Sequence, residues 1–237
     1  MRYAIIAAGE GSRLHQEGIA AAKPLVTVAG EMLIDRLIRI FQENGAEEIA
    51  VICRSDQKVI SHLQQCQGQG VPLNYTVHNT PSSMHSFYEL TSILDNRKPF
   101  ILTTVDTIFR EREFADYVSA FQNMLKAGSA DGMMGITDYI DDEKPLYVKT
   151  DTQLNILAFL DSDEHPRYVS AGIYGLTPRS LSVLNECIAR GESRMRNFQR
   201  ALLGRDYHLK AWLFSKVLDI DHIVVRSSAD YHNRKFW

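Results

Sequence analysis

The chain has 237 residues, of which 45% are hydrophobic and 23% are charged, and its formal net charge is −3. This composition is typical of a soluble globular protein and indicates neither disorder nor a membrane protein. The small negative charge argues against nucleic acid or an anionic membrane as the main partner. No apolar stretch reaches the ~18 residues of a membrane span, and the first predicted strand leaves no room for a signal peptide, so we expect a cytoplasmic protein.

In the first half of the chain, short apolar runs alternate with longer stretches of helical period, which predicts parallel strands joined by crossover helices. Strands are expected at residues 3–7, 49–53, 73–77 and 100–105. Helices are predicted by apolar stripes on Leu33, Leu37, Ile40 and Phe41, on Val59, Ile60 and Leu63, and on Phe87, Leu90, Ile93 and Leu94. A fourth helix at 112–126 should end at Gly128.

After about Asp131, short strand-like runs are separated by acidic or turn-forming segments, which predicts a mixed or antiparallel arrangement. Strands are expected at 133–137, 147–150, 156–159 and 169–176, helices at 179–190 and 194–203, and a last strand pair at 209–213 and 216–220. No linker, repeat or low-complexity segment divides the chain. We therefore predict one α/β domain over residues 1–237, with a mixed, mostly parallel central sheet.

The cysteines and histidines offer no familiar reactive or metal-binding motif. Cys53, Cys66 and Cys187 are odd in number and contain no C-x-x-C pair, so neither a disulfide framework nor a zinc site is supported, and we interpret them as buried or inert thiols. The eight histidines are not clustered at metal-ligand spacing, and H-E-x-x-H and G-x-S-x-G are absent from the sequence.

A glycine-rich turn directly after the first strand carries the most specific chemistry. Gly9 and Gly11 free several backbone N–H groups, and with Arg13 and Lys23 nearby they suit a polyphosphate. Leu14 stands where a dinucleotide-binding turn needs its third glycine, and no Gly-Lys pair exists for an ATPase phosphate loop. Both common nucleotide motifs are therefore excluded.

What remains is G-x-G-S-R-L, eight residues, and then K-P-L-V, which resembles the opening motif of the sugar-1-phosphate nucleotidyltransferases, or nucleotide-sugar pyrophosphorylases. The resemblance implies a three-layer α/β/α Rossmann-like fold, with a nucleotide-binding half in 1–130 and an acceptor-binding half in 131–237. It also implies that Arg13 neutralises the leaving pyrophosphate and that Lys23 contacts the reacting phosphates. The turn that would wrap the triphosphate consists of Ala7, Ala8, Gly9, Glu10, Gly11 and Ser12.

Carboxylates near two strand ends suggest a Mg²⁺ site. Asp106 follows the run FILTTV, at the sheet edge where ligands of open α/β sheets bind, although a lone aspartate there also suits a helix cap. Members of the family that the opening motif resembles have a metal-binding aspartate at this point. They often have a glycine directly before it, where this chain has Val105. Asp219 and Asp221 lie on the same side of an extended chain, about 7 Å apart, and resemble a second metal segment of the family. We favour Asp221, with Asp219 second; two solvated carboxylates are the alternative.

The resemblance also predicts base and acceptor contacts. Ser82 and Ser83 precede a helix, where they suit either an N-cap or contacts with the nucleobase. Ala171 and Gly172 lie in VSAGIYGL, which resembles the family's A-G-I-Y motif for the sugar phosphate, and a glycine within a strand often marks a close approach. Lys149 is a candidate for the acceptor phosphate or an ordinary surface lysine.

These features together predict a Mg²⁺-dependent enzyme that transfers a nucleoside monophosphate from a nucleoside triphosphate to a sugar phosphate and releases pyrophosphate. The family's phosphate-binding lysine before A-G-I-Y is missing, since Glu164-His165-Pro166 stands there, so choline- or inositol-phosphate cytidylyl transfer is an alternative. A non-catalytic nucleotide-sensing relative and a molybdenum-cofactor-type guanylyltransferase are further alternatives. The sequence leaves a homo-oligomer open.

Overall fold

The first strand, β1 (Arg2–Ala7), lies in the middle of the central sheet, and its residues from Tyr3 to Ala7 are buried. The computed structural model describes residues 1–10, 21–95, 97–140, 144–162 and 167–220. Strands β4 (Glu48–Cys53) and β6 (Phe100–Thr104) pair with β1 in parallel on either side, and β5 (Leu73–Val77) extends the sheet beyond β4. The four predicted strands of the first half are confirmed.

The four expected helices of this half are also present, and the predicted apolar residues pack on the core, although Ile93 and Leu94 do so from the turn after α4 and not from the helix. They are α2 (Leu33–Glu43), α3 (Gln57–Gly68), α4 (Ser83–Leu90) and α5 (Glu111–Ala127). The Ser82 side chain accepts a hydrogen bond from the His85 backbone N–H, which confirms its role as the N-cap of α4. Gly128 ends α5 in the left-handed conformation, at φ 59°, as its position predicted.

The second half continues the same sheet through β11 (Val169–Leu176), which is antiparallel to β6. Among the described residues the sheet has nine strands, and the pairings make all of them except β10 and β11 run in one direction. The fold prediction of a mixed, mostly parallel sheet is therefore confirmed. The remaining elements here are β8 (Gly132–Thr137), β9 (Tyr147–Thr150), β10 (Ile156–Leu160), α6 (Ser180–Ala189), α7 (Met195–Leu203) and β12 (Leu209–Phe214).

The last strands differ from the sequence prediction, because they do not pair with each other. Strand β12 lies parallel to β8, whereas β13 (Val217–Asp219) leaves the main sheet and pairs antiparallel with β7 (Thr107–Phe109). Two strands separated by a short turn usually pair with each other, and the sequence contains no local sign that each pairs with a distant strand instead. Besides β7, the unpredicted short elements are the 3-10 helix η1 (Lys23–Leu25) and the strands β2 (Thr27–Val28) and β3 (Glu31–Met32).

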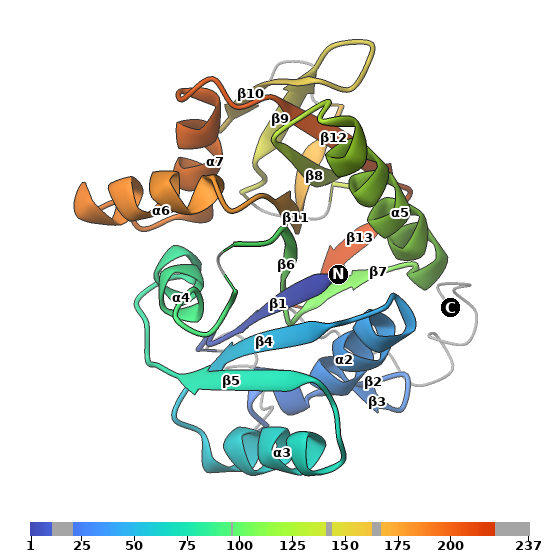
Figure 1. The fold of residues 1–237 in the computed structure, drawn as a ribbon, viewed down its shortest axis with the longest axis vertical. Helices are drawn as coiled ribbons and strands as arrows, with labels where there is room; N and C mark the ends of the chain where they lie inside the picture. The colour runs from blue at the N-terminus through green and yellow to red at the C-terminus, as the bar shows by residue number, and fades with distance from the viewer. Residues whose placement is uncertain (11–20, 96, 141–143, 163–166, 221–237) are drawn as a thin grey trace.

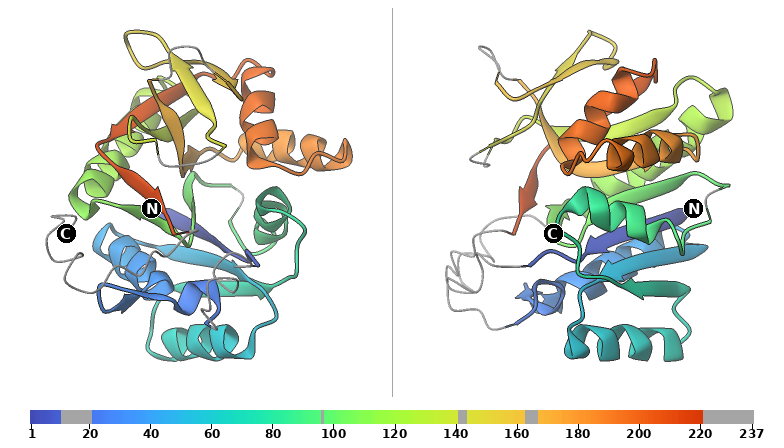
Figure 2. Two further views of the ribbon diagram at one scale, coloured as in Figure 1. Left: turned by 180° about the vertical axis from the view of Figure 1, so that it is seen from behind. Right: turned by 90° about the vertical axis from the view of Figure 1, so that its left-hand side faces the viewer.

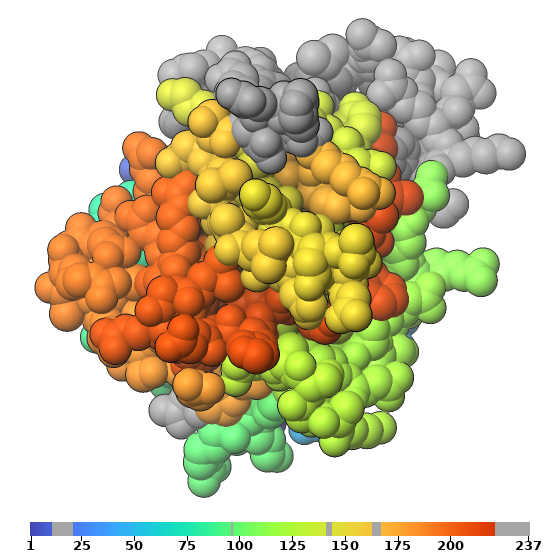
Figure 3. Space-filling view, turned by 90° about the horizontal axis from the view of Figure 1, so that it is seen from above, coloured from blue at the N-terminus to red at the C-terminus, as the bar shows by residue number. Residues whose placement is uncertain are grey.

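Helices cover both faces of the sheet, as a three-layer α/β/α fold requires. One core contains residues of α2, α3 and α5, and the other contains residues of α4, α6 and α7. Figures 1 and 2 show these helix layers on opposite sides of the strands. Seen from above in Figure 3, the yellow β9–β10 region lies between the orange α6 and α7 and the green α5. No helix in the described part of the chain is long and apolar enough to cross a membrane.

Candidate functional site

The loop after β1 leaves the sheet at the carboxyl ends of the parallel strands. Ala7 and Ala8 are buried, whereas Gly9 and Glu10 are exposed, so the chain reaches solvent at the first glycine. A side chain built on Gly9 would meet nothing within 4 Å. Open space beside exposed backbone allows a ligand to approach closely. The rest of the predicted turn, Gly11, Ser12 and Arg13, lies outside the described residues.

Lys23 and Asp106 form an ion pair at this edge of the sheet. Lys23 is the first residue of η1, and Asp106 occupies the turn between β6 and β7. Their side chains are only 10% and 13% exposed. The sequence predicted a role for each residue separately, and the structure brings the two together. A cation and a carboxylate in a sheltered pair can exchange partners when a phosphate and a metal ion arrive.

The second predicted metal segment lies next to Asp106, although it comes late in the chain. The backbone N–H of Ile220 donates a hydrogen bond to the Asp106 carbonyl over 3.1 Å, and Asp219 lies opposite Thr107 in the β13–β7 pair. The Thr107 hydroxyl donates to Asp219 Oδ1 over 3.5 Å. Asp221, the favoured second ligand, lies outside the described residues. Within the described residues, Asp219 is therefore the predicted second carboxylate that lies beside the Asp106 turn.

Gly172 also reaches this region, from a bulge in β11. Its φ is +70°, and the register of β11 against β8 shifts between Ser170 and Tyr174, around this glycine. A Cβ atom on Gly172 would lie 3.3 Å from Thr107 Oγ1, and the Thr107 hydroxyl is in turn 2.6 Å from that of Thr104. The two threonine side chains therefore occupy the space beside Gly172, and the approach of an acceptor phosphate to its backbone stays a prediction. Ala171, its neighbour in the motif, is buried.

A cavity of about 320 Å³ has Gly9, Lys23 and Asp106 in its lining, whereas Gly172 and Asp219 are not part of that lining. Its lining combines the end of β1, the β6–β7 turn and the loop before α4. The residues that line it are Ile6, Ala8, Gly9, Glu10, Lys23, Thr80, Pro81, Ser82, Ser83, Ser86, Thr104, Val105 and Asp106. Predicted phosphate, base and metal contacts from four separate stretches of sequence, Lys23 among them, therefore line one cavity.

Hydrogen bonds inside the serine-rich loop fix its shape at the cavity wall. The Ser82 hydroxyl lies 2.8 Å from His85 Nδ1, and the Thr80 and Ser86 hydroxyls are 2.5 Å apart. Ser82 and Ser83 are partly exposed, so their polar atoms remain available to a molecule in the cavity. Ser82 therefore caps α4 and, together with Ser83, presents polar groups to the cavity.

Arg54 is a candidate phosphate-binding residue that the sequence analysis missed. It follows β4 directly and lines a second cavity, of about 270 Å³, together with Gly9, Glu10 and Lys23. Its guanidinium lies 3.5 Å from both the Ala8 carbonyl and a Glu10 carboxylate oxygen. The sequence could have indicated it, because Arg54 follows a predicted parallel strand next to β1, and neighbouring parallel strands end at the same edge of the sheet.

Lys149 is not brought to this site. It is exposed in β9 and faces Ala158 across the β9–β10 pair, and neither cavity includes it in its lining. The Glu164-His165-Pro166 segment lies outside the described residues. Tyr174, from the same A-G-I-Y motif as Gly172, is buried, and its pKa is raised by this burial and, to a smaller extent, by the charge of Asp219.

Burial raises the pKa of all three cysteine thiols, so none shows a sign of reactivity. Burial raises the pKa of Cys53 and of Cys187 to about 11, so both thiols are protonated at neutral pH. The three cysteines are free and buried. Their interpretation as thiols without a disulfide is consistent with the structure.

A family model for nucleotidyl transferases matches residues 3–221, nearly the whole chain. The chain belongs to the nucleotidyl transferase family. Members of this family transfer nucleotidyl groups to sugar or alcohol phosphates and typically use a divalent metal ion. The resemblance proposed from the G-x-G-S-R-L and K-P-L-V segments is confirmed at the level of the family.

Solved structures support the fold of this nucleotidyl transferase. A Bacillus anthracis protein assigned as a glucose-1-phosphate thymidylyltransferase, in complex with a sucrose, matches at TM-score 0.82 and 21% identity, covering 100% of this chain and 97% of its own. An inositol-1-phosphate CTP transferase from T. maritima gives 0.77 and 19%, with 98% and 94% covered. A UDP-glucose pyrophosphorylase complexed with UDP-glucose gives 0.75 and 15%, with 94% of each chain covered. A sequence comparison with curated proteins gave no match.

Proposed function

We propose that this chain is a Mg²⁺-dependent nucleotidyltransferase that moves a nucleoside monophosphate from a nucleoside triphosphate to a sugar phosphate, or a similar alcohol phosphate, and releases pyrophosphate. The observation that carries the proposal is the Lys23–Asp106 ion pair beside the glycine loop, in a cavity that also holds the serine-rich loop. Membership of the nucleotidyl transferase family supports the same reaction class.

In this reaction an oxygen of the acceptor phosphate forms a bond to the α-phosphorus, and the bond from that phosphorus to the bridging oxygen of pyrophosphate breaks. No covalent enzyme intermediate is needed, so the protein contributes mainly position and charge. Lys23 would align the reacting phosphates, and Arg13 would neutralise the leaving pyrophosphate. Backbone N–H groups from Gly9 to Ser12 would hold the triphosphate.

The carboxylates near the β6–β7 turn fit Mg²⁺, which takes oxygen ligands and usually one or two carboxylates with substrate phosphates. Asp106 would hold the ion with Asp219, or with Asp221, which remains the prediction from the sequence. When bound, Mg²⁺ would neutralise charge on the phosphates. The β13–β7 pairing supports this placement, because it sets Asp219 opposite Thr107, the residue after Asp106.

The base and the acceptor are proposed to contact different parts of the chain. Ser82 and Ser83 are proposed to contact the base, which their position in the cavity lining supports. Ala171 and Gly172 are proposed to contact the acceptor, since Gly172 comes close to Thr107. Lys149 remains a prediction that its exposed position in β9 does not favour.

A choline or inositol phosphate is a second candidate for the acceptor. The lysine that relatives place before A-G-I-Y is missing here, and one structure with this fold is an inositol-1-phosphate CTP transferase. The non-catalytic alternative is disfavoured because the chain has Arg13, Lys23 and Asp106. The ten-residue spacing from Arg13 to Lys23 disfavours the molybdenum-cofactor type. We also propose a single domain, since both halves share one sheet.

The proposal is tested by measuring pyrophosphate release from each of the common nucleoside triphosphates, with Mg²⁺ and a panel of sugar, choline and inositol phosphates. We expect release that depends on one base, one acceptor class and the metal ion. The Asp116→Asn variant, at an exposed position of α5, serves as a control for a lost surface carboxylate. Absence of release with every pair of substrates would overturn the catalytic proposal in favour of a nucleotide-sensing relative.

A further inference from the structure

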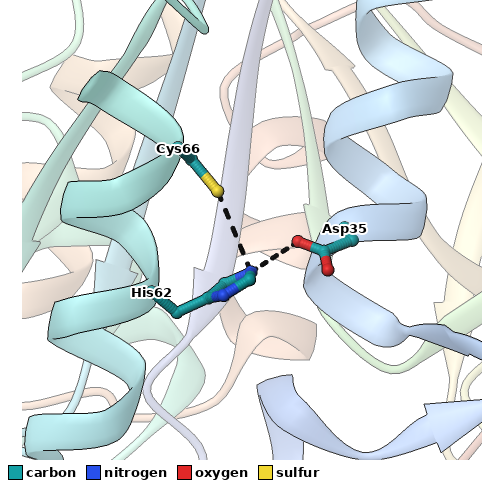
Figure 4. Close-up of side chains that lie close together, drawn as sticks. All are labelled: Asp35, His62 and Cys66. Carbon is teal, nitrogen blue, oxygen red and sulfur yellow. Dashed lines mark hydrogen bonds and ion pairs between the residues drawn. The ribbon is translucent and has the colours of Figure 1, made fainter. Parts of the chain in front are cut away.

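Helices α2 and α3 bring three possible metal ligands together on the face of the sheet that they share (Figure 4). Asp35 lies in the first turn of α2, while His62 and Cys66 lie one turn apart on α3. His62 Nε2 is 2.6 Å from Asp35 Oδ1 and 3.8 Å from Cys66 Sγ. One ligand atom from each residue lies within 4.8 Å of the other two.

The geometry differs from that of a cysteine nucleophile with a histidine base. Such a pair needs the thiol at one ring nitrogen and an orienting carboxylate at the other. Here Asp35 and Cys66 both face the same nitrogen, His62 Nε2. Oxygen, nitrogen and sulfur donors therefore point toward one common region, as the ligands of a single ion do.

Burial makes the cluster rigid on one side and accessible on the other. Cys66 is buried, whereas the side chains of His62 and Asp35 are 21% and 36% exposed. A cation could thus enter past the carboxylate and meet a thiol that packing holds in place. Neither cavity of the candidate active site has these residues in its lining, so the cluster is a separate location.

We propose that Asp35, His62 and Cys66 bind one divalent transition-metal ion, for which Zn²⁺ is the best match, with water as the fourth ligand. Zn²⁺ combines sulfur, nitrogen and oxygen ligands in tetrahedral sites, whereas Mg²⁺ takes oxygen alone. Bond lengths of about 2.0 to 2.3 Å place neighbouring ligand atoms of such a site roughly 3.3 to 3.7 Å apart.

The two observed distances can be compared with this requirement. The 3.8 Å between Cys66 Sγ and His62 Nε2 already suits two ligands of one ion. The 2.6 Å between Asp35 Oδ1 and His62 Nε2 is a direct hydrogen bond, so the carboxylate must withdraw by roughly 1 Å for an ion to take the place of the shared proton. The thiol proton is also released to solvent when the sulfur binds the ion.

The bound ion would join the start of α2 to the middle of α3. Both helices pack on the same core, and Asp56, the N-cap residue directly before α3, lines the second cavity together with Arg54. A ligand that binds the folded state alone stabilises it by mass action. We therefore expect the ion to raise thermal stability without taking part in nucleotidyl transfer.

The decisive experiment titrates the metal-free protein with Co²⁺, in excess Mg²⁺, and follows the absorption of a thiolate-to-cobalt charge-transfer band. We expect one equivalent of Co²⁺ to produce the band, because the proposed site contains the Cys66 thiolate. Cobalt bound in the active site would not produce it, because the ligands proposed there are oxygen atoms. Zn²⁺ should abolish the band by displacing cobalt, and should raise the melting temperature of the wild-type protein.

The Cys66→Ala variant should lose the band, and His62→Gln and Asp35→Asn should each weaken cobalt binding at least tenfold. Cys53→Ala and Cys187→Ala are matched controls, since both thiols are also buried, and each should retain the band. Circular dichroism of every variant verifies the fold. No band in the wild type, or a band that persists in Cys66→Ala, would overturn the proposal and leave the cluster as a hydrogen-bonded contact between helices. These readouts do not depend on nucleotidyl transfer.

Discussion

The two halves of the molecule supply the candidate active site in different ways. The first half contributes Gly9, Arg54 and Asp106, each of which follows a parallel strand of the sheet. The carboxyl ends of neighbouring parallel strands lie at one edge of the sheet, so the residues that follow these strands lie near one another. The second half contributes Gly172 from inside β11 and Asp219 from β13, a strand outside the main sheet.

The position of a site residue, after a strand or inside one, decides whether a substitution there affects stability as well as function. Groups at strand ends occupy turns and loops, so their side chains can change with limited effect on the sheet. Gly172 instead sits in a bulge, at positive φ, against Thr107, and Asp219 is held by the β13–β7 pairing. We expect changes in the first half to affect chemistry more than folding, and changes in the second half to affect both.

The largest expected effect is that of Asp106→Asn, which tests the first half of this comparison. Loss of the carboxylate charge should lower kcat by about 10²- to 10³-fold, because the variant removes a proposed metal ligand from the site. Pyrophosphate release and the urea midpoint are measured together, with Asp116→Asn as the control. An unchanged rate would exclude the metal role, and a loss of folding would contradict the separation of chemistry from stability.

Lys23→Ala should have the next largest effect. Removal of the cation should lower kcat/KM for the nucleoside triphosphate by about 10²-fold, because an electrostatic contact to the reacting phosphates is lost. Lys126→Ala is a suitable control, since Lys126 is an exposed residue of α5. If Lys23 served only as the partner of Asp106, its loss would affect the unfolding free energy and leave kcat/KM unchanged.

Gly172→Ala tests the second half of the comparison. Its left-handed backbone should cost about 1–2 kcal/mol of unfolding free energy, and its Cβ would press on Thr107, so KM for the acceptor phosphate should rise. Gly128→Ala is a matched control, because Gly128 also has positive φ but open space around it. It should lose similar stability and retain its acceptor KM; equal KM values in the two variants would exclude a role for Gly172 at the site.

The smallest expected effect is that of Arg54→Ala, which asks whether the residue missed by the sequence analysis belongs to the nucleotide edge. KM for the nucleoside triphosphate should rise about tenfold, the loss of roughly 1.4 kcal/mol that a charged contact can supply. Arg112→Ala, at an exposed position of α5, provides the comparison. A KM equal to that of the wild type would restrict Arg54 to its contacts with Ala8 and Glu10.

The sequence predicted the helices and strands of both halves closely, but it predicted pairing less well. Apolar periodicity located β5, β9 and β11 with the observed bounds. It did not reveal that β12 joins β8 or that β13 joins β7, because pairing partners far apart in the chain leave no local pattern. The short β7 and η1 were missed because an element of three residues is too short to show a helical or strand period in the sequence.

The same limit applies to the sites. Local motifs identified Lys23, Asp106 and the serine-rich loop, each from the chemistry of a few consecutive residues. The Asp35, His62 and Cys66 cluster escaped notice because its members come from two helices, and only His62 and Cys66 are close in sequence. A search for histidine and cysteine one helical turn apart would have found two of the three.

The sequence by itself determined the family, the order of the elements and the residue types needed for phosphate and metal chemistry, because strand and helix periods and short motifs are properties of neighbouring residues. Only the tertiary structure decided which of those residues meet. The Lys23–Asp106 pair, the approach of Gly172 to Thr107 and the meeting of α2 with α3 all join distant segments. Such contacts depend on how the sheet and its helices pack, which no local pattern records.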